Sequence, residues 1–302
     1  MSFGRPYILK IDGCIHDGWL VLQNIQSDID KDYLYSVLSS PSAYHQFEKM
    51  AVGGVVNNLN SDKVKELIFH LPPLAEQKHI VTVLDKCTAL IAKHKRMLEK
   101  HDMLIKSRFI EMFGDNKYPL KSIENYIDKN ILSAKKRYAV EDVIKYIDIS
   151  SIDNIHNTII GHTEYIFEKA PSRAQQCVRK NDILISTIRP NLKNVALIQK
   201  NGDFVASSGF CVLRPRCIPE YLFVNVITDS FTNEMKRKTT GANYPAIKNA
   251  DVYDYLIPDV PLALQEKFAE FVRAVDAEKA LAQKSLGKAE TLYKALMQRY
   301  FA

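Results

Sequence analysis

One sequence pattern occurs twice in this chain of 302 residues, and the two copies keep a constant register. Pro73-Leu74-Ala75-Glu76-Gln77 begins a long helical run that ends at Phe113, and Pro261-Leu262-Ala263-Leu264-Gln265 begins a matching run that ends at Phe301. The offset is 188 positions at the proline, the glutamine and the phenylalanine. A small domain followed by a long helix, used twice, predicts a molecule that holds two similar surfaces at a fixed separation.

The similarity continues upstream of each helix, but the first copy is shorter than the second. The matching segments are residues 54–68 with 241–256, residues 18–22 with 209–213, and Arg5-Pro6 with Arg189-Pro190. Nothing in the first copy corresponds to residues 115–188. We therefore expect the first domain either to be a truncated remnant or to receive its remaining part from another chain.

Composition and charge are typical of a globular protein and permit nucleic acid as a partner. The chain is 46% hydrophobic, and it has neither an apolar run long enough to cross a membrane nor a signal-peptide pattern at its N-terminus, so we expect a cytoplasmic protein without membrane contact. The formal net charge of +6 allows DNA binding without requiring it. Five cysteines without Cys-x-x-Cys spacing argue against disulfides and structural zinc: Cys14, Cys87, Cys177, Cys211 and Cys217.

The first helical run carries a heptad pattern. Its apolar residues fall seven positions apart at Leu84, Ile91, Leu98, Ile105 and Met112, with a second column beside them at Val83, Leu90, Met97 and Leu104. Such a stripe, two residues wide, indicates a helix that pairs along its length with another helix. About 40 residues make a helix of roughly 60 Å.

The second helical run is the expected antiparallel partner. It places Phe268, Val275, Leu286 and Leu296 at helical spacing, with many alanines between them that allow close approach. A single domain lies between the two runs and returns the chain, which favours pairing within one molecule. A coiled-coil dimer between two chains is the alternative.

The region between the helices is predicted to be a mixed α/β domain. Short strands are expected at residues 144–149, 182–188, 194–198, 204–207 and 209–213, with a hairpin turn at Asn201-Gly202-Asp203 and one helix over 219–235. The predicted fold class is α+β, with mixed α/β domains joined to two long antiparallel helices that form a coiled-coil spacer. The predicted boundaries are 1–72, 73–114, 115–260 and 261–302.

Two basic clusters suggest contact with DNA phosphates. The first is Ser133, Lys135, Lys136, Arg137 and Tyr138, and the second is Lys236, Arg237, Lys238, Thr240 and Tyr244. Lysine and arginine displace counterions from DNA, while hydroxyls and backbone N–H groups fix the register of the protein on the duplex. A run of charge on a solvated face is the alternative interpretation of each cluster.

A third group lies where a predicted strand ends, at Ser186, Thr187, Arg189, Asn191 and Lys193. Arginine and asparagine have the bidentate geometry that guanine and adenine edges require. The alternative is that Arg189 and Asn191 hold the turn together. The recurrence of Arg-Pro at residues 5–6 favours this alternative, because a residue that both copies share is a poor candidate for reading one particular base sequence.

Metal binding and catalysis find little support in the sequence. Cys87, His94 and His101 recur every seven residues, so successive members lie about 10 Å apart along a helix, too far for shared ligation. The chain shows no methyltransferase Asn-Pro-Pro-aromatic loop, no glycine-rich nucleotide-binding pattern and no complete nuclease pattern. We therefore expect a non-catalytic protein without a metal site.

The sequence resembles the specificity subunit of type I restriction-modification systems over nearly its whole length. The resemblance is carried by residues 71–77 with the helix up to Met112-Phe113-Gly114, by the repeat from Val260-Pro261-Leu262, by residues 186–192, and by residues 206–213, which contain Ser207 and Ser208. In that family, two target-recognition domains alternate with two long helices, and each domain reads one half of a bipartite DNA sequence. By resemblance, Ser207 and Ser208 join the candidate DNA-binding residues.

The resemblance also implies partners and cofactors. The subunit would bind double-stranded DNA and two methyltransferase subunits, and the complex would recruit a restriction and translocase subunit. The chain itself would need no cofactor, because S-adenosylmethionine, ATP and magnesium would bind on the partners. The alternative function is a structural adaptor that does not read DNA, or a silent truncated remnant.

Overall fold

The computed structural model describes residues 4–51, 59–114, 117–241 and 245–302. The chain forms two compact units, unit 1 (Met1–His101 and Ala277–Ala302) and unit 2 (Asp102–Asp276). Each long helix contributes residues to both units, so this division by contacts differs from the boundaries that the sequence pattern suggests.

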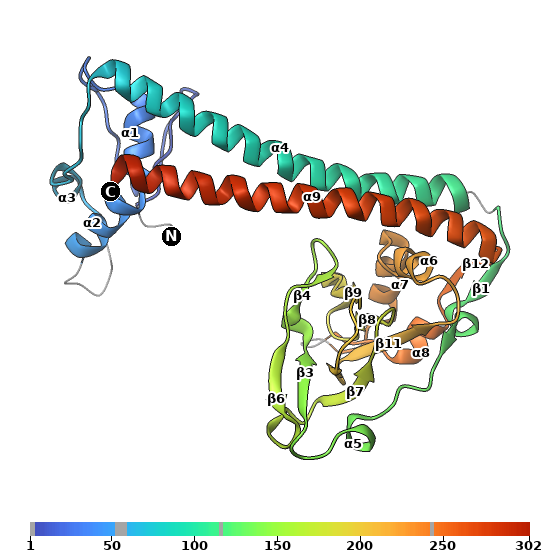
Figure 1. The fold of residues 1–302 in the computed structure, drawn as a ribbon. Helices are drawn as coiled ribbons and strands as arrows, with labels where there is room; N and C mark the ends of the chain where they lie inside the picture. Colours follow the sequence, from blue (N-terminus) through green and yellow to red (C-terminus); the bar gives the residue numbers. More distant parts are fainter. Residues whose placement is uncertain (1–3, 52–58, 115–116, 242–244) are drawn as a thin grey trace. The chain divides into compact units, whose positions relative to one another are not determined.

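The two long helices are α4 (Leu74–Phe113) and α9 (Leu262–Phe301) (Figure 1). In unit 1, Leu84 of α4 packs with Met297 of α9, and Leu98 packs with Leu286. In unit 2, Ile105 belongs to the same buried cluster as Val275. As residue numbers increase along α4, the residues contacted in α9 have decreasing numbers. The two helices are therefore antiparallel, as predicted. All the predicted packing residues are buried or half-buried: Leu84, Ile91, Leu98, Ile105, Met112, Phe268, Val275, Leu286 and Leu296.

The seam between the helices is narrower than the sequence pattern suggests. Leu90, Met97 and Leu104 of the second column are 41%, 36% and 47% exposed. A single partner helix covers one stripe, and the alanines that α9 presents, such as Ala282, are too short to reach a second column. The prediction of a buried stripe two residues wide is therefore wrong.

Unit 2 contains two four-stranded sheets, with strand orders β6-β3-β10-β7 and β2-β11-β8-β9, and the two-stranded pairs β1-β12 and β4-β5. The strands are β1 (Leu120–Ser122), β2 (Ile127–Asp128), β3 (Val143–Ile147), β4 (Ile152–Asp153), β5 (Thr158–Ile159), β6 (Thr163–Ile166), β7 (Ala174–Val178), β8 (Ile183–Ser186), β9 (Val195–Leu197), β10 (Phe204–Ser207), β11 (Phe210–Pro215) and β12 (Leu256–Pro258). The predicted hairpin at Asn201-Gly202-Asp203 is wrong, because this turn connects β9 to β10 and the two strands belong to different sheets.

Strand β11 lies between two hydrophobic cores. Its residues alternate in direction, as strand geometry requires. Cys211 and Leu213 join the larger core of unit 2, whereas Phe210 and Val212 join a second core with residues of both four-stranded sheets. Both faces of this strand are therefore buried.

The helices of unit 2 are α5 (Ala134–Arg137), α6 (Pro219–Val226), α7 (Asp229–Lys238) and α8 (Asn249–Tyr253). The single helix predicted over 219–235 is wrong, because Thr228 interrupts it with extended backbone (φ −68°, ψ 155°) and caps α7 by accepting a hydrogen bond from the N–H of Phe231. An N-cap threonine satisfies a helix N–H that has no partner within the helix. Four 3₁₀ turns complete the unit: η1 (Ile123–Tyr126), η2 (Ile149–Ser151), η3 (Phe167–Lys169) and η4 (Pro190–Leu192).

Unit 1 repeats the helices of unit 2 in the same register. Helices α1 (Lys31–Leu38), α2 (Pro41–Ala51) and α3 (Ser61–Lys65) begin 188 positions before α6, α7 and α8. The cap of α2 is repeated as well, because the Ser40 hydroxyl accepts from the N–H of Ala43 as Thr228 does in unit 2. The sequence repeat is therefore a structural repeat over these helices.

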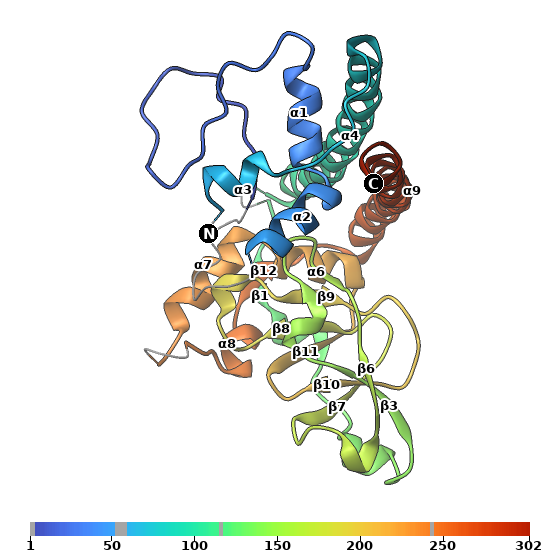
Figure 2. The ribbon, with the colours of Figure 1, turned by 90° about the vertical axis from the view of Figure 1, so that its left-hand side faces the viewer.

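The repeat does not extend to the strands. Residues 18–22, which match residue 209 and the first four residues of β11, belong to a long irregular segment ahead of α1 (Figure 2). In unit 2, β11 is held between β2 and β8. Among residues 4–51 and 59–101 no strand forms that could pair with residues 18–22. A strand needs a hydrogen-bonded neighbour, and the local sequence alone does not supply one.

A buried glutamine fixes the start of each long helix. The Gln77 side chain accepts from the N–H of Asp30 (2.8 Å) and donates to the carbonyls of Asp28 and Pro72 (2.8 Å each). Gln265 accepts from the N–H of Ile218 (3.2 Å) and donates to the carbonyl of Val260 (2.8 Å). Each glutamine thus joins its long helix to the segment just before α1 or α6.

A buried tyrosine completes the same arrangement. The hydroxyl of Tyr33 donates to the carbonyl of His70 (2.8 Å), and that of Tyr221 donates to the carbonyl of Pro258. The last aromatic of the other long helix packs on each ring, with ring centroids 5.6 Å apart for Phe301 on Tyr33 and 5.3 Å apart for Phe113 on Tyr221. Each helix therefore begins in one copy of the pattern and ends against the other.

Replacement of Gln77 by leucine should destabilise unit 1 by about 3 kcal/mol, because it leaves one N–H and two carbonyls without partners in a buried site. Urea unfolding followed by circular dichroism measures this. Lys78→Leu changes the neighbouring exposed position and is the matched control, with an expected change below about 0.5 kcal/mol. Equal effects of the two substitutions would show that the amide contacts contribute little.

Candidate nucleic-acid interface

The connection between β8 and β9 has a strained backbone. Arg189 and Lys193, on either side of η4, both have left-handed conformations with φ of 50° and 54°. Non-glycine residues adopt this conformation rarely, and each costs about 1–3 kcal/mol unless its surroundings fix it. Strain of this kind often marks functional loops, so the contacts that hold this connection identify a candidate site.

Backbone hydrogen bonds join three loops at this place. Both the N–H and the hydroxyl of Thr187 donate to the carbonyl of Gly209 (2.9 Å each), and the Thr187 carbonyl accepts from the N–H of Ile247 (2.9 Å). The N–H of Arg189 donates to the carbonyl of Pro245 (2.8 Å). We call residues 187–193, 207–209, 240–241 and 245–247 the loop cluster.

The loop cluster exposes side chains suited to DNA. Arg189, Asn191, Ser208 and Thr240 are exposed, and Lys193 is half-buried. Helix α7 packs against η4, and its last turn carries Lys236, Arg237 and Lys238. The structure thus brings together most of the second and third candidate groups. Tyr244 lies outside the described residues.

Opposite charges within unit 2 hold part of this basic surface. Lys193 forms an ion pair with Asp229, and the hydrogen bond from Lys193 lowers the pKa of Asp229, with the charges of Lys193, Lys106 and Lys236 adding to the effect. Arg237, whose side chain is 78% exposed, pairs with Glu234 at 3.1 Å. Exposed pairs of this type contribute little to stability, so these cations remain able to exchange partners with phosphate.

Two of the predicted contact residues are buried. Ser186 and Ser207 are only 2% and 3% exposed. The Ser186 hydroxyl donates to the carbonyl of Ile188 (2.8 Å), and the Ser207 hydroxyl accepts from the N–H of Gly209 (3.3 Å). Both hydroxyls shape their turns, and DNA contact by either residue stays a prediction.

The first basic cluster extends away from the loop cluster. Ser133 forms a bridge to Gln176, whose side chain donates to the carbonyl of Ser207. Arg137 and Tyr138 instead contact Asp203 at the other end of β10 (3.1 and 3.4 Å). Burial raises the pKa of Tyr138 to about 12. Lys135 and Lys136, which lie between Ser133 and Arg137 in the sequence, are exposed. Only the Ser133 end of this cluster therefore approaches the loop cluster.

Two asparagines that the sequence did not single out support the strained loop. The Asn154 side chain donates to the carbonyl of Leu192 (2.8 Å), and the Asn157 side chain donates to the carbonyls of Lys193 (3.0 Å) and Val195 (3.2 Å). Asn157 is itself left-handed, with φ of 53°. The asparagines around position 155 indicate a turn, but nothing local identifies the carbonyls that they reach.

The described parts of the chain show neither a metal-ligand cluster nor a membrane-spanning helix. Within residues 4–51, 59–114, 117–241 and 245–302, no group of three or more potential ligands converges on a metal site. His101, which belongs to the set that recurs every seven positions, lies 3.2 Å from the carboxylate of Glu278 on the other long helix. No helix within those ranges is both long enough and apolar enough to cross a bilayer.

Comparison with known proteins decides the family. Residues 2–100 and 115–291 match the model of the type I restriction modification DNA specificity domain. The chain belongs to this family. The match covers most of unit 2, including the loop cluster, and part of each long helix.

Two relatives match about half of the chain. The chain is 24% identical over 181 residues to the specificity subunit of the type I restriction enzyme HindI from Haemophilus influenzae, which covers 58% of this chain and 39% of that protein. The HsdS subunit from Thermoanaerobacter tengcongensis has 33% identity and a TM-score of 0.46, over 56% of this chain and 46% of that one. The chain therefore spans less than half the length of these two relatives.

A third relative matches over more of the chain. The type I restriction-modification S subunit from M. genitalium covers 91% of this chain and 73% of its own, with a TM-score of 0.54 and 16% identity. At this identity the comparison shows a shared fold. The mixed fold with two long helices, predicted from the sequence, is thereby confirmed.

Replacement of Asn157 by alanine should loosen the strained loop, because the carbonyls of Lys193 and Val195 lose their donor and an alanine tolerates φ of 53° poorly. We expect amide hydrogen exchange at residues 191–195 to accelerate about tenfold, equal to about 1.4 kcal/mol of local stability. Asn157→Gly removes the same amide without the backbone strain and separates the two causes. Unchanged exchange in both variants would contradict a supporting role for Asn157.

Proposed function

We propose that this chain is the sequence-specific DNA-binding specificity subunit of a type I restriction-modification complex, and that the loop cluster of unit 2 reads one half of a bipartite target. The observation that carries the proposal is the strained loop that exposes Arg189 and Asn191 and packs against α7, a helix with a basic last turn. Family membership supports the DNA-reading role. The strained backbone fixes these side chains before DNA arrives, which reduces the entropy lost on binding.

The contacts divide into two classes. Lys236, Arg237 and Lys238, with the hydroxyls of Ser208 and Thr240, supply phosphate contacts that position the protein. Arg189 and Asn191 supply hydrogen bonds to base edges. Lys135 and Lys136 extend the phosphate track on the side of α5.

The same proposal covers partners and location. The subunit acts in the cytoplasm and itself catalyses no reaction. It binds two methyltransferase subunits and a restriction and translocase subunit. S-adenosylmethionine, ATP and magnesium bind on those partners, and this chain contributes recognition and spacing only. The relatives named above are specificity subunits, which supports this division of labour.

The first test is co-expression of this chain with the methyltransferase subunit encoded beside it, followed by single-molecule sequencing of the host DNA for methylated adenine. We expect a new methylated motif that contains at least one defined half. Methylation that appears without this chain would assign recognition to another subunit. If the purified complex forms and no new motif appears, the DNA-reading proposal fails and the adaptor interpretation replaces it.

Two substitutions should then separate base contact from phosphate contact on the motif so defined. Asn191→Ala should reduce discrimination at one base position by about 1–3 kcal/mol with an unchanged salt dependence. Lys236→Ala should weaken binding to all sequences and reduce the slope of log K against log salt by about 0.9. Fluorescence anisotropy on matched and mismatched duplexes measures both quantities.

Lys180→Ala is the matched control for the lysine. Lys180 is equally exposed but lies before β8, at the opposite end of that strand from the loop cluster. We expect the slope to be unchanged in this variant. An equal loss of slope in Lys180→Ala and Lys236→Ala would show diffuse electrostatic attraction in place of a defined site.

A further inference from the structure

A turn at the border of the loop cluster exposes an arginine that belongs to neither basic cluster of the sequence. Residues 171–174 lead from η3 into β7, and Pro171, Ser172 and Arg173 are exposed. The N–H of Ala174 donates to the carbonyl of Pro171 (2.8 Å), and Ala174 is only 6% exposed. We call residues 171–174 the Arg173 turn. Its backbone is fixed where it enters the strand, while the side chain of Arg173 is exposed.

Hydrogen bonds join the Arg173 turn to the loop cluster. The N–H of Ser208 donates to the carbonyl of Arg173 (2.8 Å), and Ala174 pairs with Ser207 where β7 and β10 run antiparallel. The Gln176 side chain adds a hydrogen bond to the carbonyl of Ser207 (2.9 Å). Arg173 and Ser208 are therefore held as neighbours by the backbone of two paired strands.

The same turn adjoins the segment that leads into α5. Helix α5 packs against β7, and Ser133, just before α5, forms an antiparallel bridge to Gln176. Strand β7 thus has this segment along one edge and β10 along the other. Lys135 and Lys136 are exposed on α5. The Arg173 turn therefore connects their part of the surface with the loop cluster.

The guanidinium of Arg173 differs from its basic neighbours in having no carboxylate beside it. Lys193 and Arg237 each form an ion pair with a carboxylate of α7. Among the residues that the structure describes, none forms an ion pair or a side-chain hydrogen bond with the Arg173 guanidinium. Its five N–H donors are thus available to an external anion without the loss of an internal pair.

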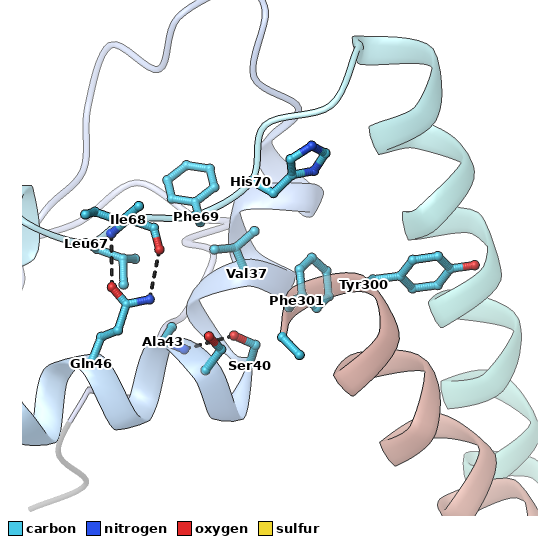
Figure 3. A pocket seen from close by; sticks show the side chains of 12 residues that line it. Val37, Ser40, Ala43, Gln46, Leu67, Ile68, Phe69, His70, Tyr300 and Phe301 are labelled. Atoms are coloured by element: carbon cyan, nitrogen blue, oxygen red, sulfur yellow. Dashed lines mark hydrogen bonds between the residues drawn. The ribbon is translucent and has the colours of Figure 1, made fainter.

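The hollow in unit 1 lacks this chemistry. It has a volume of about 280 Å³ and is lined by Val37, Phe69 and Phe301, among others (Figure 3). The Gln46 side chain beside it is bonded to the backbone N–H and carbonyl of Ile68 (3.1 and 2.8 Å). None of the twelve described residues that line the hollow is lysine or arginine. The hollow therefore offers no permanent cation to a phosphate, in contrast to the Arg173 turn.

We propose that Arg173 binds a DNA phosphate, with the hydroxyls of Ser172 and Ser208 as further donors to the DNA backbone. The Arg173 turn then joins the phosphate contacts of the loop cluster to those of Lys135 and Lys136. Arginine with adjacent hydroxyls is a frequent combination at phosphates, and such contacts fix the position of a protein on the duplex. The proposal rests on the proposed function and adds a binding residue to it.

The position of Arg173 gives this phosphate contact a definite role. The 207–209 turn contacts the Arg173 turn through Ser208, and its Gly209 carbonyl accepts from the N–H and hydroxyl of Thr187 (2.9 Å each), two residues before Arg189. A phosphate held at Arg173 is therefore linked through one short turn to the loop that carries Arg189. The contact sets the register in which that loop meets the bases.

Salt-dependent binding tests the proposal. The full chain, purified with the methyltransferase subunit encoded beside it, is titrated with duplexes of its methylated motif, and fluorescence anisotropy is recorded at several salt concentrations. Arg173→Ala should weaken binding to matched and mismatched duplexes by the same factor, about tenfold at 0.1 M salt, and should reduce the slope of log K against log salt by about 0.9. Arg173→Lys should retain most of the slope, because a lysine still neutralises a phosphate.

Strand β7 provides the matched control. Arg179 follows the last residue of β7 as Arg173 precedes the first, and it is also exposed. Six residues of extended chain separate the two arginines by about 20 Å. Arg179→Ala should leave both the affinity and the slope unchanged. Equal losses in Arg173→Ala and Arg179→Ala would show diffuse attraction by net charge and would overturn the proposal.

A modified duplex locates the phosphate. Neutral methylphosphonates replace single phosphates of the motif in turn, and one of them should weaken binding of the unsubstituted chain without weakening binding of Arg173→Ala any further. Additive losses at every phosphate would overturn the proposal. A loss confined to one base pair, with an unchanged slope and no rescue by Arg173→Lys, would assign Arg173 to a base edge and overturn the phosphate contact.

Lys236→Ala separates this proposal from the proposed function. If Lys236→Ala reduces the slope and Arg173→Ala does not, the Arg173 contact is wrong and the proposed function stands. If the unsubstituted complex binds matched and mismatched duplexes equally, the proposed sequence-specific function fails, whatever Arg173→Ala does to the slope.

Discussion

The buried glutamine in the first turn of each long helix is the contact on which the rest of the structure depends. A helix start leaves several N–H groups without partners, and the chain that leads into it carries further unpaired polar groups. The Gln77 amide satisfies polar groups of the chain next to the helix, because it accepts from the N–H of Asp30 and donates to the carbonyls of Asp28 and Pro72. Gln265 repeats the acceptor contact at Ile218 and a donor contact at Val260.

The contacts at the start of each long helix also determine what the last aromatic residue of the other long helix packs against. Because Tyr33 and Tyr221 hold the segments in front of α4 and α9, their rings become fixed platforms. Phe301 and Phe113 pack on these rings, so the antiparallel pair is anchored by aromatic contacts as well as by the aliphatic seam. Such ring pairs add roughly 0.5–1.5 kcal/mol beyond their buried area. The constant offset of 188 positions follows from this reciprocity, since an insertion in one helix would displace its terminal ring from the partner's tyrosine.

The parts of the fold that the sequence predicted are those in which the signal is local. The proline, the glutamine and the heptad of apolar residues indicate helices of 40 residues, and α4 and α9 have that length. Strand positions were also close, because β-branched and aromatic residues mark buried strands. The predictions fail where the structure depends on residues that are distant in the sequence. Asn201-Gly202-Asp203 has hairpin chemistry, but its two strands pair in different sheets. The exposure of Leu90 and Met97 depends on how wide a stripe α9 can cover.

The candidate site shows the same division between local and distant causes. Hydroxyls near a strand end suggested Ser186 and Ser207, but both side chains are buried and bonded within their own turns. Asn157 could not be found from its neighbours, since its partners are the carbonyls of Lys193 and Val195. The Arg-Pro pair illustrates the point most clearly. Arg189 is left-handed because Gly209 and Pro245 hold its loop, whereas Arg5, which has the same following proline, is not among the described residues with positive φ. The geometry that displays Arg189 is therefore set by the contacts of its loop, which the dipeptide alone does not encode.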